Sequence, residues 1–109
     1  MELHEADCVV VKPGKKDPDM GFDIGGWQGR VEEVYQDEGT VLIRWDSITL
    51  FGMGDELIIQ PEIENLDWEL MVLDISDLKK TVCRDSVSDT NNAAKILQGK
   101  IIDDPRLAD

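Results

Sequence analysis

The chain has 109 residues, 41% of them hydrophobic, and it carries 24 acidic against 11 basic side chains, a net charge of −13. This length allows one small hydrophobic core. A surface so acidic repels nucleic acids and anionic membranes, which bind proteins through Lys and Arg, and it favours cations and basic protein partners. We therefore expect one domain over residues 1–84 with a C-terminal tail over 85–109, and neither a nucleic-acid nor a membrane partner.

The first predicted strand is the apolar run Ala6–Lys12 (ADCVVVK), which Pro13 and Gly14 end. Cys8 in this run and Cys83 far along the chain belong to no CxxC or Cys/His cluster. Both are expected to be reduced thiols, with Cys8 as a small core residue. The first residues lack a basic region followed by an apolar one, so we expect no signal peptide and a cytoplasmic protein.

A Gly-, Pro- and Asp-rich loop separates this strand from the clearest local feature, a β-hairpin in which Trp27–Gln36 pairs with Thr40–Asp46. Alternate side chains over Val41–Trp45 are apolar and share one face of the second strand. Gly39 suits the left-handed position that ends such a turn, because a Cβ would be strained there.

After the hairpin, apolar spacing predicts one short or kinked helix between Asp55 and Asn65, with the kink at Pro61. The segment Trp68–Lys80 (WELMVLDISDLKK) predicts a returning strand with Val72 on its apolar face, although part of its spacing also suits a helix.

The tail predicts a C-terminal helix that begins at a cap formed by Ser88 or Asp89 and ends at Gly99.

Several short alternating strands in about seventy residues predict a mainly β fold. We expect a small SH3-like barrel, closed to remove its edges, with a short helical insertion and a C-terminal helix. The predicted core consists of Val9, Val11, Val31, Val41, Ile43, Trp45 and Val72.

Catalytic motifs are not recognisable in the sequence, so the protein is not expected to be an enzyme. The glycines of Gly25–Gly29 have the wrong spacing for a phosphate-binding loop and precede a strand. The single histidine, His4, has no companion for a nucleophile–base set or for zinc.

The chemistry that remains is oxygen coordination of a hard cation. Asp37, Glu38 and Thr40 place two carboxylates and a hydroxyl at the tip of the hairpin. Calcium takes six to eight oxygen ligands, so the tip is a candidate calcium site. The same residues also suit an ordinary solvated turn, and solubility alone is an alternative explanation of the acidic surface as a whole.

A second candidate set is Asp17, Asp19 and Asp23 in the long loop. An EF-hand is rejected, because Gly21 lies at position five rather than six and Gln28 stands where the bidentate Glu belongs. An irregular calcium site and a polar loop with Asp-stabilised turns both remain open.

Five aromatic residues allow a different function. A cage for a basic or methylated side chain, as in Tudor-type barrels, is one interpretation, but core packing is favoured for Trp27 and Trp45. The alternative to calcium binding is thus an acidic SH3/Tudor-like module for basic peptides. The five are Trp27, Tyr35, Trp45, Phe51 and Trp68.

Three segments, DIGGWQGRVEEV, DEGTVLIRWDSITL and NLDWELMVLDISDL, resemble the small cyanobacterial calcium-binding protein family (CcbP-type), over about Val9 to Lys80. The resemblance implies an SH3-like barrel that binds calcium (Ca2+) through loop carboxylates, without an EF-hand and without catalysis. It places the principal ion at the loop of Asp37, Glu38 and Thr40. We therefore expect a calcium buffer or signalling protein.

Overall fold

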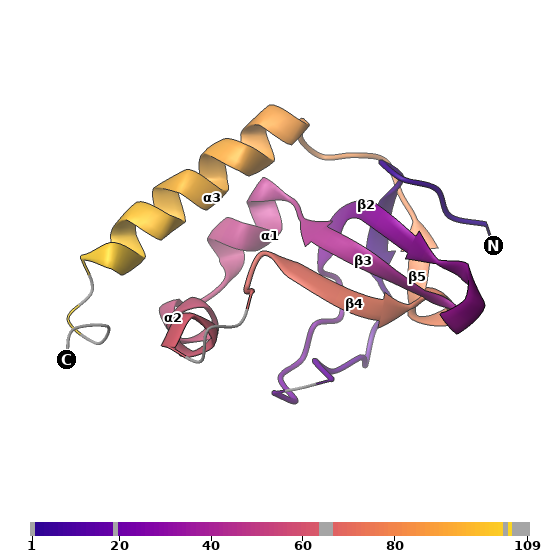
Figure 1. Ribbon diagram of the computed structural model, residues 1–109, viewed down its shortest axis with the longest axis horizontal. Coiled ribbons are helices and arrows are strands. Elements are labelled where there is room, and N and C mark those ends of the chain that lie inside the picture. Colours follow the sequence, from indigo (N-terminus) through magenta and orange to yellow (C-terminus); the bar gives the residue numbers. More distant parts are fainter. Residues whose placement is uncertain (1, 19, 64–66, 104, 106–109) are drawn as a thin grey trace.

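The computed structural model describes residues 2–18, 20–63, 67–103 and 105 (Figure 1). One five-stranded antiparallel sheet has the order β4-β3-β2-β1-β5. The helices lie toward one end of this sheet, as Figure 1 shows. The strands are β1 (Cys8–Val11), β2 (Gln28–Tyr35), β3 (Thr40–Trp45), β4 (Leu70–Asp74) and β5 (Leu78–Lys80). The helices are α1 (Ser47–Gly52), α2 (Asp55–Ile63) and α3 (Val87–Ile102), with 3-10 turns η1 (Gln36–Glu38) and η2 (Ile75–Asp77).

The predicted hairpin is confirmed. Strands β2 and β3 pair antiparallel, with Val34 opposite Val41 and a bulge between Val31 and Glu33. The turn is η1, and Gly39 closes it at φ +68°, the left-handed conformation that the turn requires.

A mainly β fold is confirmed, but the closed barrel is wrong for the described residues. β4 and β5 are the two ends of the sheet order, and no pairing joins them. The three residues of η2 nevertheless lead from one edge to the other, so the sheet must curl strongly to bring its edges near each other. The result is an open, curled sheet with two edge strands.

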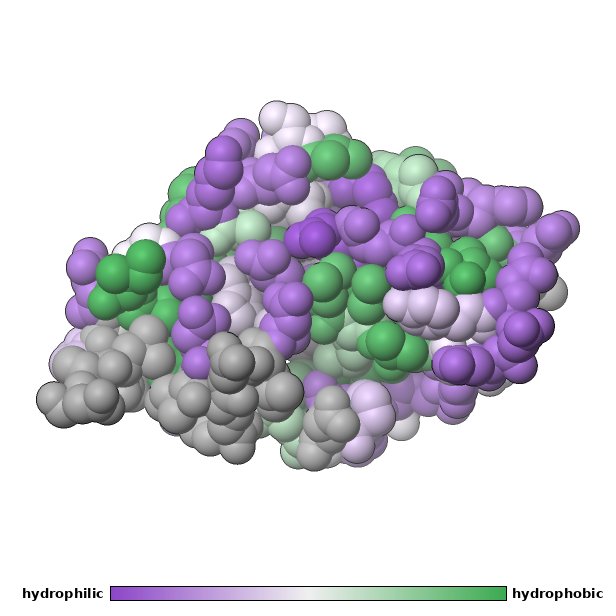
Figure 2. All heavy atoms as spheres, viewed as in Figure 1, coloured by the Kyte–Doolittle hydropathy of each residue, from purple (hydrophilic) through white to green (hydrophobic). Residues whose placement is uncertain are grey.

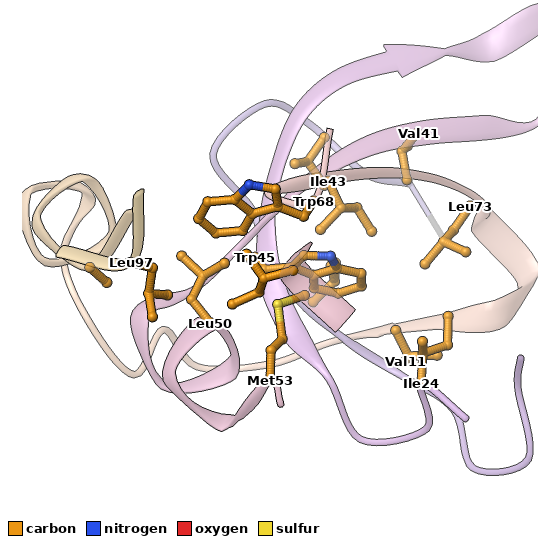
Figure 3. Packing of buried hydrophobic residues seen from close by; sticks show 14 of the residues in the cluster. Val11, Ile24, Val41, Ile43, Trp45, Leu50, Met53, Trp68, Leu73 and Leu97 are labelled. Carbon is orange, nitrogen blue, oxygen red and sulfur yellow. The ribbon is translucent and has the colours of Figure 1, made fainter. Parts of the chain in front are cut away.

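The core lies on one face of the sheet and continues under the helices (Figure 3). Trp45 is fully buried at its centre, against residues of α1 and the segment after it. Of the predicted core residues all but one are buried: Val9, Val11, Val31, Val41, Ile43 and Trp45.

Val72 is the error in the predicted core. Its side chain is 45% exposed, whereas its neighbour Leu73 is 6% exposed and belongs to the core. The pairing of β4 with β3 sets Leu73 opposite Val41, and directly opposed residues point to the same face. Since successive side chains alternate, Val72 must point to the outer face.

Helix α2 confirms the predicted helix from Asp55 as far as Ile63, with Pro61 inside it. Asn65, where the prediction ended, lies outside the described residues. Helix α1 was not predicted. It begins at the N-cap Asp46, whose carboxylate accepts the backbone N–H of Thr49, and sequence periodicity reveals little about so short a helix.

The C-terminal helix is present, but both predicted ends are wrong. Ser86 is the N-cap of α3, and Asp89 completes a capping box three residues later, so Ser88 lies inside the first turn. Gly99 lies within the helix, which continues because packing outweighs the modest cost of one glycine. Three buried apolar side chains of α3, each four residues apart, belong to the same core as the sheet: Ala93, Leu97 and Ile101.

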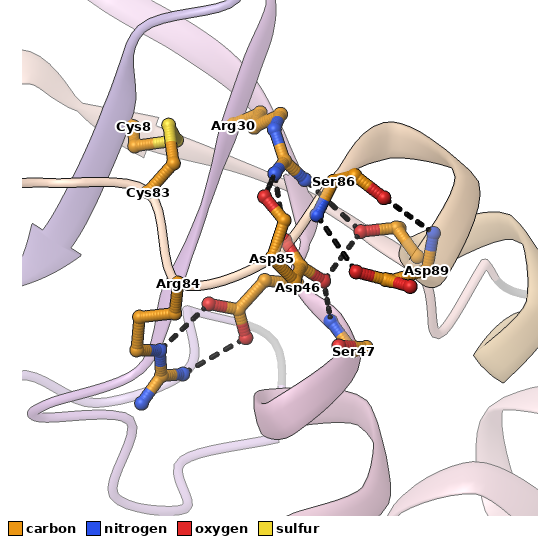
Figure 4. Close-up of a disulfide and its surroundings, with 10 residues drawn as sticks. Cys8, Arg30, Asp46, Ser47, Cys83, Arg84, Asp85, Ser86 and Asp89 are labelled. Atoms are coloured by element: carbon orange, nitrogen blue, oxygen red, sulfur yellow. Dashed lines mark hydrogen bonds and ion pairs between the residues drawn. A yellow bond between two sulfur atoms is a disulfide. The ribbon is translucent and has the colours of Figure 1, made fainter.

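The two cysteines form a disulfide, so the prediction of reduced thiols is wrong for this structure (Figure 4). The pairing of β1 with β5 brings the segments of the two cysteines together, and Thr81 donates its backbone N–H to the carbonyl of Cys8. Cys83 follows two residues later. Because disulfides are rare in reducing compartments, the bond counts against a cytoplasmic location, which stays a prediction.

In the described part of the chain, none of the helices is long and apolar enough to cross a membrane.

Candidate functional site

The hairpin tip presents the two acids that the sequence singled out. Asp37 and Glu38 are exposed in η1, and neither forms a hydrogen bond or ion pair with another described residue. The hydroxyl of Thr40, at the start of β3, is buried and has no hydrogen-bond partner among the described residues. The tip therefore combines two solvated carboxylates with an unsatisfied hydroxyl.

An acid that was not predicted lies beside this tip. The β3–β4 pairing sets Asp74 opposite Thr40, and Ile75 donates its backbone N–H to the carbonyl of Gly39. Asp74 is exposed and therefore adds a third carboxylate to the neighbourhood of the turn. A long-range register decides this neighbour, so no local pattern could have revealed it.

The pKa of Tyr35 reflects first its burial and then the negative charge of this end of the hairpin. Partial burial raises the pKa of its phenol, and the hydrogen bond to Glu33 and the negative charges of Glu33 and Glu38 raise it further. Ionised carboxylates disfavour a phenolate beside them, whereas they favour a cation.

The described residues contain no group of three or more His, Cys, Asp or Glu side chains that is arranged to hold a metal. The described acids of the tip and of the long loop, Asp17 and Asp23, therefore do not converge on one preformed centre. Any ion at the tip would take most of its ligands from water and backbone carbonyls.

The acids of the long loop support turns. Asp17 is 8% exposed, and its carboxylate accepts the backbone N–H of Met20 at 2.7 Å. Asp23 accepts the backbone N–H of Gly25 at 2.9 Å. These contacts are the Asp-stabilised turns that the sequence allowed as an alternative to a calcium site. Asp19 lies outside the described residues.

The best-connected charged cluster surrounds the start of α1 (Figure 4). Arg84 forms a bidentate pair with Asp46, at 2.9 Å from Nε to Oδ2 and 2.8 Å from Nη2 to Oδ1. The hydroxyl of Thr49 accepts a further bond from Arg84 and donates one to the carbonyl of Gln28. These contacts tie the chain after the disulfide to the start of α1 and, through Thr49, to β2.

Asp85 anchors the start of α3 in the same way. Its carboxylate accepts the backbone N–H of Ser47 at 2.7 Å and the hydroxyl of Thr90 at 3.0 Å, and pairs with Arg30 at 2.7 Å. Burial raises the pKa of the Asp85 carboxyl, but the hydrogen bonds from Ser47, Arg30 and Thr90 outweigh it and hold the pKa below its ordinary value. Since internal partners engage these charges, the cluster serves the fold.

The motifs behind the family resemblance have structural roles. In GWQGRV, a Cβ on Gly29 would lie 2.4 Å from the carbonyl oxygen of Arg44, so only glycine fits. In WDSIT, Trp45 fills the core and Asp46 caps α1. These residues therefore account for the architecture and not for a ligand.

A pocket of about 440 Å³ opens beside β4. Its lining comes from the loop around 17–22, Trp27, the helical segment 53–61 and residues 67–72, with Leu42 of β3. The Phe22 and Trp27 rings lie 5.6 Å apart, and Trp27 meets Trp45 edge-on at 5.1 Å.

The five aromatics do not form one cage. Only Trp27 and Trp68 line the pocket, whereas Phe51 is 52% exposed on α1 and Tyr35 lies at the far end of β2. The core assignment is confirmed for Trp45, which is fully buried, and Trp27 is partly buried against that core.

No protein-family model, curated protein or solved structure matches this chain, so the resemblance to the CcbP-type family stays a prediction.

Proposed function

We propose that this protein is a calcium-binding protein with an SH3-like fold, which takes up calcium at the hairpin tip and acts as a buffer or signalling protein rather than as an enzyme. The observation that carries the proposal is the pair of adjacent exposed carboxylates, Asp37 and Glu38, which have no cationic partner among the described residues. Asp74 and the unsatisfied hydroxyl of Thr40 add oxygen donors nearby.

Charge and coordination chemistry favour calcium at such a site. The net charge of −13 raises the local concentration of cations, and neighbouring carboxylates repel one another unless a cation lies between them. Calcium tolerates irregular geometry and water ligands, whereas magnesium demands a near-ideal octahedron. An open site of this kind fits a low to moderate affinity.

The long loop is a candidate for a second, weaker site. Asp17 and Asp23 already use a carboxylate oxygen in a turn, so a calcium ion there would compete with these hydrogen bonds. We expect Asp19→Asn and Asp23→Asn to affect only a weaker binding event.

Titration calorimetry with calcium and with magnesium tests the proposal. Asp37→Asn and Glu38→Gln should each abolish or sharply weaken the tightest calcium event, because each removes a formal charge from a site with few protein ligands. Asp103→Asn, the same charge change at the end of α3, is the matched control and should bind normally. Normal calcium binding by both tip variants would refute the site.

Calcium should also stabilise the fold. If it binds the folded chain alone, a hundredfold excess over Kd adds about 2.7 kcal/mol to the free energy of unfolding. The gain should fade as acid protonates the ligands. Sodium chloride at equal ionic strength should not reproduce it, since screening of the acidic surface acts without regard to the ion.

A further inference from the structure

The pocket beside β4 has the lining of a site for an apolar side chain. Its volume of about 440 Å³ is in the range of ligand pockets, and most of its lining residues are apolar, with Asp17 and Asp67 as the acidic ones. Met53, Trp68 and Met71 contribute to it, and methionine adapts to differently shaped partners. Figure 2 shows hydrophobic surface gathered over β4 in the middle of the face drawn, with hydrophilic residues around it.

The pocket runs along the outer edge of β4, where backbone N–H and C=O groups are not used by the pairing with β3. β4 pairs with β3 on one side, and the described residues provide no strand on the other. The hydrogen bonds from Trp45 N–H to Glu69 and from Ile75 N–H to Gly39 identify the hydrogen-bonded pairs of this ladder.

In an antiparallel ladder the pairs alternate, so every second residue of β4 turns its backbone groups away from β3. Leu70 and Val72 are two such residues, and both line the pocket. Among the described residues, their backbone groups form no hydrogen bond with a segment outside the sheet. An extended chain beside β4 would therefore find donors and acceptors next to an apolar cavity.

The acidic charge around the pocket favours a basic occupant. The described lining contains Asp17 and Asp67 and no Lys or Arg. Arg44, the nearest cation on β3, is paired with Glu32 at 2.7 Å and Glu69 at 3.1 Å. A second copy of this chain would bring a further charge of −13 to the same place, so the field disfavours self-association and favours a basic partner.

We propose that the edge of β4 and its pocket bind an extended basic peptide, which adds as a strand beside β4 and inserts one apolar side chain into the pocket. Backbone hydrogen bonds then supply affinity, and the pocket and the acidic surroundings supply specificity. The proposal gives a location to the basic-peptide alternative raised by the sequence. It does not depend on calcium binding at the hairpin tip.

A labelled peptide of alternating Lys and Val with a central Leu is the probe, and the same peptide with Glu in place of Lys is its control. Fluorescence anisotropy should show binding of the basic peptide and none of the acidic one. The affinity for the basic peptide should fall as salt is added. Amide hydrogen exchange of the unmodified protein should slow at Leu70 and Val72 when the basic peptide is present, since their N–H groups become bonded.

Val72→Pro removes the outward N–H without touching the ladder to β3, because proline is tolerated on a strand edge. It should weaken the basic peptide by about tenfold, whereas Val72→Thr, which keeps the N–H and the branched side chain, should bind normally. Asp67→Asn should weaken binding a few-fold at low salt and little at high salt. Asp103→Asn is the matched charge control and should leave peptide binding unchanged.

Equal binding of the acidic peptide would overturn the charge argument, and unchanged exchange at Leu70 and Val72 in the bound unmodified protein would overturn the strand geometry. Protection of these amides that rises with protein concentration, without peptide, would mean that a second copy occupies the edge. Loss of calcium binding in Asp37→Asn leaves peptide binding unaffected, so the two proposals fail separately.

Discussion

Breaking the Cys8–Cys83 disulfide should remove a large fraction of the stability. The bond closes a loop of 75 residues. Chain-entropy theory gives an entropy loss in the unfolded chain of about 15 cal/mol/K for such a loop, or about 4.5 kcal/mol at 25 °C. The free energy of unfolding of a domain of this size is about 5–15 kcal/mol. We expect the loss of the bond to lower it by about 2–4.5 kcal/mol.

Cys83→Ser is the cleanest perturbation, because Cys83 is exposed and its replacement leaves the core unchanged. Urea unfolding followed by tryptophan fluorescence measures the effect. The midpoint should fall in Cys83→Ser, and a reductant should lower the wild-type midpoint by the same amount while leaving the variant unchanged. The slope of unfolding free energy against urea concentration should be slightly steeper in the variant, since an uncrosslinked unfolded chain exposes more surface.

An unchanged wild-type unfolding midpoint in reductant, with labelling to show that both thiols have become free, would refute the expected contribution of the disulfide. It would mean that the pairing of β1 with β5 and the contacts of Arg84 and Asp85 already hold this segment without the bond.

Three further predictions test the packing and the electrostatics. Gly29→Ala should lower the melting temperature strongly, because its Cβ would lie 2.4 Å from a β3 carbonyl oxygen, whereas Gly99→Ala, with open space in α3, should stabilise by about 0.5–1 kcal/mol. Leu73→Ala should cost about 2–5 kcal/mol in urea unfolding, and Val72→Ala on the outer face much less. Asp85 has a lowered pKa in the folded protein, so its stabilisation is complete above its unfolded pKa and is lost as the pH falls through the folded one. Asp85→Asn should therefore be destabilised at neutral pH and show a flatter decline in stability with acid.

Local patterns were sufficient for the hairpin and for much of the core. Alternation places Val41, Ile43 and Trp45 on one face because a strand has a period of two, and Gly39 ends the turn because only glycine is unstrained there. The presence of helix α2 was likewise predicted from residues within its own segment. Each of these depends on residues that are neighbours in the sequence.

The candidate sites depend on contacts between distant segments. The sequence identified Asp37 and Glu38, but the position of Asp74 beside them follows from the β3–β4 register. The same register places the Val72 side chain on the outer face and turns the backbone groups of Leu70 and Val72 toward the free edge, where we propose the peptide site.

The disulfide and the pair of Asp46 with Arg84, 38 residues apart, also join segments that no local pattern relates. The sequence by itself therefore determined the hairpin, the presence of α2 and α3, and the acidic charge. Only the tertiary structure decided which carboxylates meet, which cysteines pair and which edge stays open, because strand pairing and side-chain packing over the whole chain set these choices.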